Sequence, residues 1–207
     1  PPRRFTHGIP GGVNKTIAHC TIDELHVNKT DPAAQAVIGD AKFALQALTA
    51  EMSAKTSGYG RPAGKVAAEV KSVRESAMVK YREAMASTEK PINPYKVYAG
   101  LMEALDPHNS FLTHESGNTR DQLSTVYDTL VPRAFLGWGN VSSLGFSFAA
   151  TIAAKLSFPE KQCVAVTGEA GLGYMLGQLE VALRQNISIT VVHVSNGGFA
   201  GYGPGFW

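Results

Sequence analysis

The chain has 207 residues, of which 44% are hydrophobic and 17% are charged, and its formal net charge is +2. This composition fits one large or two small globular domains and excludes an intrinsically disordered chain. So small a net charge gives no reason to expect a nucleic-acid or membrane partner, and no apolar run approaches the roughly 20 residues that span a bilayer.

The first elements along the chain indicate a small α/β segment. Residues 16–22 (TIAHCTI) predict a short strand, and the apolar pair at 37–38 leads through Asp40 into a helical pattern. Asp40 is a suitable N-cap for that helix. The helix would bury an apolar stripe made by Phe43, Leu45, Leu48 and Met52. Residues 1–56 are therefore expected to be part of an α/β domain, too small to close a core alone.

Residues 57–92 predict a connector that contains a helix. The stretch SGYGRPAG at its start and the sequence EKPINP at its end are rich in glycine and proline, which interrupt regular structure. Between them lies an alanine-rich stretch in which Lys, Arg and Glu alternate at helical spacing, and this pattern is typical of a solvated helix.

Residues 93–207 alternate between helical and strand patterns. Helices are expected at 94–105, 142–156 and 174–184, strands at 110–113, 163–167 and 187–194, and residues 122–130 are irregular or helical. This alternation predicts an α/β fold, a doubly wound parallel sheet with helices on both faces. Ligands of such sheets bind beyond the carboxyl ends of the strands. Those ends carry the sequences HESGN, TGEAG and SNGG.

The chain ends and the cysteines bear on its context. The N-terminal sequence PPRRFTHGIPGG has no initiator methionine and no apolar signal-peptide core, so we expect a segment from the middle of a longer protein. The cysteines, Cys20 and Cys163, both lie in predicted strands and lack the spacing of a metal site. A reduced, cytoplasmic protein is the expected setting.

Glu169 stands among glycines directly after the predicted strand 163–167. A dinucleotide-binding fingerprint would need an acid at the end of the next strand, but that strand ends in Ser195 and Asn196. A phosphate-binding P-loop would need a Lys-Ser/Thr pair after the glycines, and none follows. Taken alone, the stretch is equally well explained as an exposed acid in a glycine turn.

A second side chain changes the interpretation of Glu169. Asn196 follows it by 27 residues, with one predicted helix between them. If the crossover joins neighbouring strands, both side chains arrive at the same edge of the sheet. A carboxylate and an amide oxygen, completed by a loop carbonyl and two phosphate oxygens, form the oxygen shell that Mg²⁺ prefers. Glycine backbone N–H groups and a helix N-terminus favour the anion, so the pattern predicts a diphosphate site held by a divalent ion.

At this level of detail the sequence resembles the thiamine diphosphate-dependent enzymes, in particular the acetolactate synthase-like group. The stretch GEAGLGYMLGQLEVALRQNISITVVHVSNGG is similar to their Gly-Asp-Gly to Asn-Asn motif. Three further stretches resemble other parts of the same domain: INPYKVYAGLMEAL, THESGNTRDQ and GWGNVSSLGFSFAATIAAKL. Upstream, KTIAHCTIDELHVNKTDPAAQAVIGDAKFALQAL is similar to the end of the central domain. The resemblance thus implies central-domain residues 1–56, a linker 57–92 and a diphosphate-binding domain 93–207.

The resemblance also implies roles for individual residues. Glu169 takes the place of the metal-ligating Asp, Asn196 that of the second Asn, and Gly198 that of a carbonyl ligand. Leu144 corresponds to the bulky residue that holds the cofactor in its bent form. The remaining cofactor-binding positions are Gly117, Asn118, Thr119, Ser143, Gly168, Ala170 and Gly171. The implied cofactors are thiamine diphosphate and Mg²⁺, and the resemblance also admits FAD or an ADP moiety near Asp23, where a structural or solvated role is the alternative.

Departures from the family pattern leave two functions open. Glu replaces Asp at 169, Ser195 replaces the first Asn, and Gly171 lacks the family's serine hydroxyl. The family's pyrimidine-binding domain has no counterpart in the chain, and its diphosphate domain continues beyond the final sequence GYGPGFW. We therefore expect a truncated domain and a homo- or hetero-oligomeric assembly with a chain that carries the pyrimidine-binding domain.

The resemblance implies a lyase or transferase. Its small-molecule substrates would be 2-oxo acids or 2-hydroxyacyl compounds, joined or decarboxylated at the carbonyl, and this chain would supply the diphosphate and metal half of the site. The alternative is a non-catalytic or regulatory subunit that kept the fold and lost the chemistry.

Overall fold

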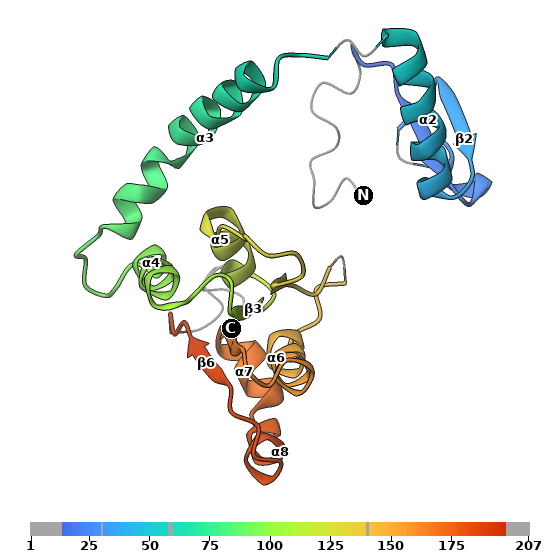
Figure 1. The fold of residues 1–207 in the computed structure, drawn as a ribbon. Coiled ribbons are helices and arrows are strands. Elements are labelled where there is room, and N and C mark those ends of the chain that lie inside the picture. Colours follow the sequence, from blue (N-terminus) through green and yellow to red (C-terminus); the bar gives the residue numbers. More distant parts are fainter. Residues whose placement is uncertain (1–13, 30, 58–59, 140, 198–207) are drawn as a thin grey trace, which may run out of the picture. The chain divides into compact units, whose positions relative to one another are not determined.

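The computed structural model describes residues 14–29, 31–57, 60–139 and 141–197. The chain forms two compact units, residues 1–69 and 70–207, and each is considered by itself (Figure 1). The boundary falls inside helix α3, Ala63–Met85, within the segment 57–92 that was expected to be a linker. Over the described ranges, none of the helices combines the length and apolarity that crossing a membrane requires.

The first unit contains a two-stranded parallel sheet and one long helix. Strand β1, Ala18–Thr21, pairs with β2, Gln35–Ile38, and the short helix η2, Glu24–His26, lies between them in the sequence. Helix α2 follows at Ala41–Thr56. The expected N-cap is confirmed, because the Asp40 carboxylate accepts a hydrogen bond from the Lys42 N–H at 2.9 Å.

The apolar stripe predicted on α2 is not buried. Phe43, Leu45, Leu48 and Met52 are all more than half exposed, with exposed fractions of 55–67%. Two short strands offer too little surface to cover a helix of 16 residues. No residue of the first unit is buried in the part of the chain that the structure describes, which agrees with the expectation that this segment cannot close a core alone.

The second unit is built on a four-stranded sheet in which every pair is parallel. Its strands are β3, Ser110–His114; β4, Phe135–Leu136; β5, Gln162–Thr167; and β6, Thr190–His193. The order across the sheet is β4-β3-β5-β6. Leu112 lies beside Val164, and Thr167 lies beside His193. The predicted doubly wound parallel sheet is therefore confirmed.

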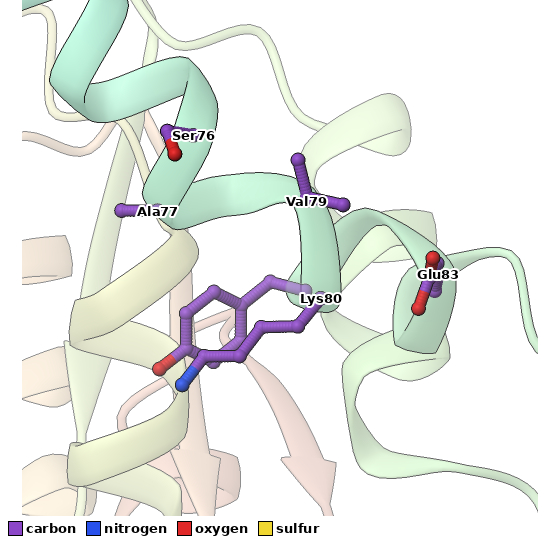
Figure 2. Close-up of a pocket in the computed structure, with 6 residues that line it drawn as sticks. Ser76, Ala77, Val79, Lys80 and Glu83 are labelled. Carbon is purple, nitrogen blue, oxygen red and sulfur yellow. The ribbon is translucent and has the colours of Figure 1, made fainter.

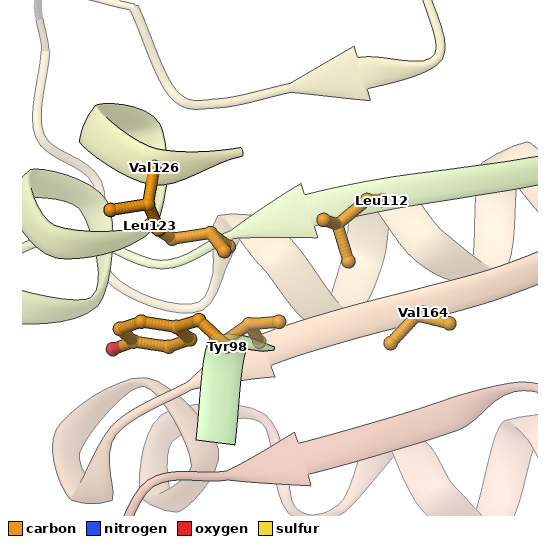
Figure 3. Packing of buried hydrophobic residues seen from close by; sticks show 6 residues of the cluster. Tyr98, Leu112, Leu123, Val126 and Val164 are labelled. Atoms are coloured by element: carbon orange, nitrogen blue, oxygen red, sulfur yellow. The ribbon is translucent and has the colours of Figure 1, made fainter. Parts of the chain in front are cut away.

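Helices cover both faces of this sheet. On one face, Tyr98 of α4 (Pro94–Ala104) and Leu123 of α5 (Asn118–Val126) pack against Leu112 and Val164, as Figure 3 shows. On the other face, α6 (Phe146–Ser157) packs on β3 and β5 through Ala154, Phe111 and Cys163. Residues 111 and 112 point to opposite faces because side chains alternate along a strand.

The helix boundaries follow local signals. Helix α4 begins where expected because the Asn93 side chain accepts a hydrogen bond from the Tyr95 N–H at 3.0 Å and Pro94 occupies the first turn. The helix expected at 142–156 begins only after Gly145, whose φ of +89° is left-handed. The helix expected at 174–184 begins within the last residues of α7 (Glu169–Met175), is interrupted at residues 176–177 and continues as α8 (Gln178–Arg184).

The connections around β3 define where a ligand would bind. The chain passes from β3 to β4 on one side and then returns to β5 on the other side of β3. The strand order therefore reverses between β3 and β5, and in doubly wound sheets the region beyond the carboxyl ends of such a strand pair, here called the crevice, is where ligands bind. The sequences HESGN and TGEAG lie at these two ends.

Candidate functional site

Glu169 and Asn196 lie next to each other at the carboxyl edge of the sheet. Glu169 is the first residue of α7, directly beyond β5, and Asn196 follows the end of β6, the neighbouring strand. The Asn196 backbone N–H donates a hydrogen bond of 2.7 Å to Oε1 of Glu169. Glu169 is half-buried and Asn196 is exposed. The crossover thus joins neighbouring strands, as the prediction of a shared edge required.

The loop after β3 forms the opposite side of the crevice. Gly117 has a φ of +85° and ψ of −144°, a region that only glycine adopts easily, and it directly precedes α5. Gly117 and Asn118 are exposed, so their backbone can approach a ligand. Thr119 is buried, and its hydroxyl donates to the Glu115 carbonyl oxygen at 3.3 Å. The hydroxyl of this predicted cofactor residue therefore stabilises the turn.

The loop before α6 carries two further predicted residues. Ser143 is exposed, and Leu144 has an exposed fraction of 42%, so its apolar side chain is accessible at the surface. Gly145 packs closely on α7: an added Cβ would lie 2.5 Å from Cγ of Met175. The loop that holds Leu144 and the helix that begins with Glu169 are thus in direct contact.

The glycine turn after β5 contains two kinds of glycine. Gly168 has extended backbone, and an added Cβ would meet no atom within 4 Å. Gly168 and Ala170 are half-buried. Gly171 is buried, and an added Cβ would lie 2.4 Å from Cγ of Glu115. Any side chain at this position would therefore collide with Glu115 in this arrangement.

Glu115 is a site residue whose importance the sequence interpretation missed. Its side chain is only 1% exposed. Oε1 accepts a hydrogen bond from the Ser116 N–H at 3.0 Å, and Oε2 accepts one from the Ser147 hydroxyl at 2.9 Å. Buried carboxylates are rare in proteins unless they are paired or hydrogen-bonded. The sequence signal was weak, because an acid beside a polar loop is usually exposed.

His114 and Trp138 pack beside the same loop. Burial lowers the pKa of His114, and its ring lies 5.1 Å from that of Phe135. An added Cβ on Gly137 would lie 2.1 Å from Nε2 of His114, so the ring fills the space beside that glycine. Trp138 is 9% exposed, and the Arg120 guanidinium lies 5.1 Å from its ring centre. These contacts give both residues packing roles.

One predicted ligand and one predicted nucleotide contact stand apart from this geometry. Gly198 lies outside the described residues. Asp23 caps η2, accepting a hydrogen bond from the Leu25 N–H at 3.0 Å, and Oδ2 lies 3.5 Å from Nε2 of His26. Within the described ranges, no group of three or more His, Cys, Asp or Glu side chains is arranged to hold a metal. A divalent ion at Glu169 would therefore need oxygen ligands of other kinds.

A surface pocket of about 450 Å³ lies elsewhere in the second unit (Figure 2). It is lined by six residues of α3: Ser76, Ala77, Val79, Lys80, Tyr81 and Glu83. The Lys80 ammonium lies 4.8 Å from the centre of the Tyr81 ring. None of these residues is at the carboxyl end of a strand, so the pocket is separate from the crevice between β3 and β5.

Comparison with known families identifies the class of domain that this geometry represents. Residues 115–203 match the family described as "Thiamine pyrophosphate enzyme, C-terminal TPP binding domain". The match begins at the buried acid after β3 and includes the turn after β5 and Asn196. The chain is therefore related to the thiamine diphosphate-dependent enzymes of the acetolactate synthase-like group, as its sequence motifs indicated.

Individual relatives agree with this assignment. The chain is 24% identical over 208 residues to the probable acetolactate synthase large subunit of Methanococcus aeolicus, covering 93% of this chain and 34% of that protein. It is 30% identical over 131 residues to mouse 2-hydroxyacyl-CoA lyase 1, covering 61% and 22%. It is 24% identical over 197 residues to oxalyl-CoA decarboxylase of Escherichia coli K12, covering 94% and 34%. The chain thus spans about a third of the length of the relatives that it matches most fully.

Proposed function

We propose that the chain forms the diphosphate- and metal-binding half of a thiamine diphosphate-dependent lyase or transferase. Its substrates would be 2-oxo acids or 2-hydroxyacyl compounds. The observation that carries the proposal is the hydrogen bond of 2.7 Å between the Asn196 N–H and Oε1 of Glu169, which places both residues at one sheet edge inside a TPP-binding domain. The relatives' names, a synthase, a lyase and a decarboxylase, support this general class.

The residues present fit a divalent ion that is shared with a diphosphate. Glu169 offers a carboxylate and Asn196 an amide oxygen, the hard oxygen ligands that Mg²⁺ selects. Mg²⁺ seldom relies on a cage made by protein alone, and it usually completes its shell with water and substrate phosphate oxygens. A site whose described residues include no group of three or more His, Cys, Asp or Glu side chains is therefore consistent with Mg²⁺ bound through the cofactor's diphosphate.

Each element of the site has a defined task under this proposal. Glu169 would hold the ion with its negative charge, and Asn196 would complete the shell on the β6 side. The backbone at Gly117 and Gly168 is open enough to approach the diphosphate, since an added Cβ at either glycine meets nothing within 4 Å. The exposed Leu144 side chain would support the cofactor's bent form. When bound, thiamine diphosphate supplies a thiazolium ring that acts as an electron sink.

The proposal includes a partner for this half of the site. Activation of the cofactor in the resembled family uses a glutamate on a pyrimidine-binding domain, and we propose that this domain comes from another chain or from another part of a longer protein. Exposed apolar side chains of the second unit, among them Leu156, Leu179 and Leu183, are suited to such association. A stable, well-folded monomer of this chain alone, at its mass of 22.0 kDa, in sedimentation velocity would contradict this part of the proposal.

A non-catalytic or regulatory subunit is the second candidate. The observations that favour it are Glu169 in place of the family's Asp and Ser195 in place of the first Asn. A longer side chain at 169 changes the distance between the carboxylate and the diphosphate. Such a subunit would keep the sheet and its crevice but would not bind the cofactor.

One binding experiment distinguishes the enzyme from the non-catalytic or regulatory subunit. The purified protein, in the form its gene encodes and with its pyrimidine-binding partner, is titrated with thiamine diphosphate in excess Mg²⁺ and again in excess EDTA. The enzyme proposal expects saturable binding in Mg²⁺ that is lost in EDTA, and loss of binding in Asn196→Ala. An absence of binding in both buffers would favour the regulatory subunit.

A further inference from the structure

We propose that Glu115 is a positioning residue that sets the location of α7, and through it the location of Glu169. The inference rests on the proposed function, since the importance of Glu169 comes from the metal site. It goes beyond that function because Glu115 itself would not contact the metal or the cofactor.

The Glu115 carboxylate is held in place from two elements. The Ser116 N–H from the loop after β3 donates to Oε1, and the Ser147 hydroxyl from the first turn of α6 donates to Oε2. The backbone of Glu115 is also fixed, because its N–H donates to the Val166 carbonyl of β5 at 2.9 Å. A side chain that is 1% exposed and bonded in this way has little freedom to move.

A buried polar network extends this support into the sheet. The Thr113 hydroxyl donates to the Ser147 carbonyl oxygen at 2.8 Å, and the Thr151 hydroxyl donates to the same carbonyl at 2.8 Å. Thr113, Ser147 and Thr151 are each no more than 1% exposed. Hydrogen bonds to the Ser147 carbonyl oxygen thereby join β3 to α6, and the hydroxyl of the same Ser147 donates to Glu115.

Helix α7 lies against this supported carboxylate. The Gly171 Cα is so close that an added Cβ would lie 2.4 Å from Cγ and 2.6 Å from Cδ of Glu115. At the other end of α7, Met175 lies against Gly145 at similarly close range. The helix has only seven residues, so these two contacts fix its position, and Glu169 is two residues before the first of them.

The proposal is tested with a matched pair of glycine substitutions. Gly171→Ala adds a methyl group in the space that Glu115 occupies, whereas Gly173→Ala adds one on the same helix where nothing lies within 4 Å. We expect Gly171→Ala to raise the Kd for thiamine diphosphate in Mg²⁺ roughly tenfold or more. This change in Kd is about what the loss of one buried charged hydrogen bond would cause. Gly173→Ala should leave the Kd unchanged within about twofold.

A double substitution tests whether Glu115 is the partner. Glu115→Ala should also weaken binding roughly tenfold, but in the double variant Glu115→Ala/Gly171→Ala the added methyl group no longer meets Cγ. The double variant should therefore bind no more weakly than either single variant. Effects that multiply to roughly a hundredfold would show that the two positions act independently and would overturn the proposal.

Amide hydrogen exchange gives a readout that needs no cofactor. In the cofactor-free protein, the amides of α7 should exchange faster in Gly171→Ala and Glu115→Ala than in Gly173→Ala, whose added methyl group meets nothing within 4 Å. Equal exchange in all three variants would overturn the positioning role. If the parent protein binds no thiamine diphosphate, the proposed function fails while the exchange comparison still decides this inference.

Discussion

Two acids occupy equivalent places in the fold and differ in their surroundings. Glu115 follows β3 and Glu169 follows β5, and these neighbouring strands end at the same edge of the sheet. Glu115 is 1% exposed, and both of its oxygens accept hydrogen bonds from the domain itself. Glu169 is half-buried and lies beside the exposed Asn196. The domain therefore buries the first acid within its own hydrogen bonds, whereas the second accepts the Asn196 N–H at the half-buried start of α7, where we propose that the metal binds.

The glycines that precede the two helices show the same division. Gly117, before α5, has a positive φ that other residues adopt only with strain. Gly168, before α7, has extended backbone that any residue adopts, and it has open space around it. Glycine at 117 is therefore required by backbone conformation, whereas the backbone at 168 does not require glycine, and an added Cβ would meet nothing within 4 Å at either position. Access for a ligand at Gly168 is part of the proposed function.

The largest expected effect is the difference between Glu115→Ala and Glu169→Ala in the free energy of unfolding. Glu115→Ala leaves the Ser147 hydroxyl and the Ser116 N–H without their partner in a buried place, so the free energy of unfolding should fall by about 2–4 kcal/mol. Glu169→Ala, measured without metal, should lower it by less than about 1 kcal/mol. Urea unfolding can be followed by the fluorescence of the buried Trp138 in a Trp207→Phe background. Equal losses from the two substitutions would remove the distinction between the acids.

A smaller effect is expected from the paired glycine substitutions. Gly117→Ala should lower the free energy of unfolding by about 1–3 kcal/mol, because alanine is strained at a φ of +85°. Gly168→Ala should change it by no more than about 0.5 kcal/mol and should still weaken cofactor binding, since its methyl group would stand where the diphosphate approaches. The same urea titration, combined with a binding titration, measures both. A Gly168→Ala variant that binds normally would show that this glycine is not needed for access.

The smallest effect concerns pH. Burial is the main cause that lowers the pKa of His114, with a further contribution from Arg120. Between that lowered pKa and the ordinary value of about 6.5, the unfolded chain binds a proton that the folded protein does not, so the free energy of unfolding rises with pH and levels off above this window. The slope from this residue cannot exceed about 1.4 kcal/mol per pH unit. His114→Gln should flatten it, as measured by urea unfolding at a series of pH values.

The sequence predicted the parts of the fold that depend on periodicity. The strands expected at 110–113 and 163–167 are β3 and β5 to within one residue at their ends, and helix 94–105 is α4. Buried strands and capped helices carry strong local signals, here short runs of mostly apolar residues and an Asn-Pro start. The short strand β4 was missed because its two residues have no pattern of their own.

The site was only partly predictable for a physical reason. The proximity of Glu169 and Asn196 follows from strand order and one crossover, both of which leave traces in the sequence. The burial of Glu115 depends on donors 1 and 32 residues away and on a glycine in another helix. No local pattern records such contacts, so a buried acid and an exposed acid look the same in the sequence. The prediction that α2 buries its apolar stripe was wrong for a similar reason, because the sequence of the stripe does not show which surface would cover it.

The central claim is that Glu169 holds a divalent ion against the diphosphate of thiamine diphosphate. The most direct measurement is calorimetric titration of the cofactor into the parent, Glu169→Gln and Glu169→Asp proteins, each with and without Mg²⁺ and with the pyrimidine-binding partner present. Glu169→Gln keeps one oxygen but loses the charge that balances the metal, so Mg²⁺-dependent binding should disappear. Glu169→Asp keeps the charge and should bind as well as the parent or more tightly. If Glu169→Gln binds with the parent's affinity and the same dependence on Mg²⁺, Glu169 is an ordinary acid in a glycine turn and the metal site is refuted.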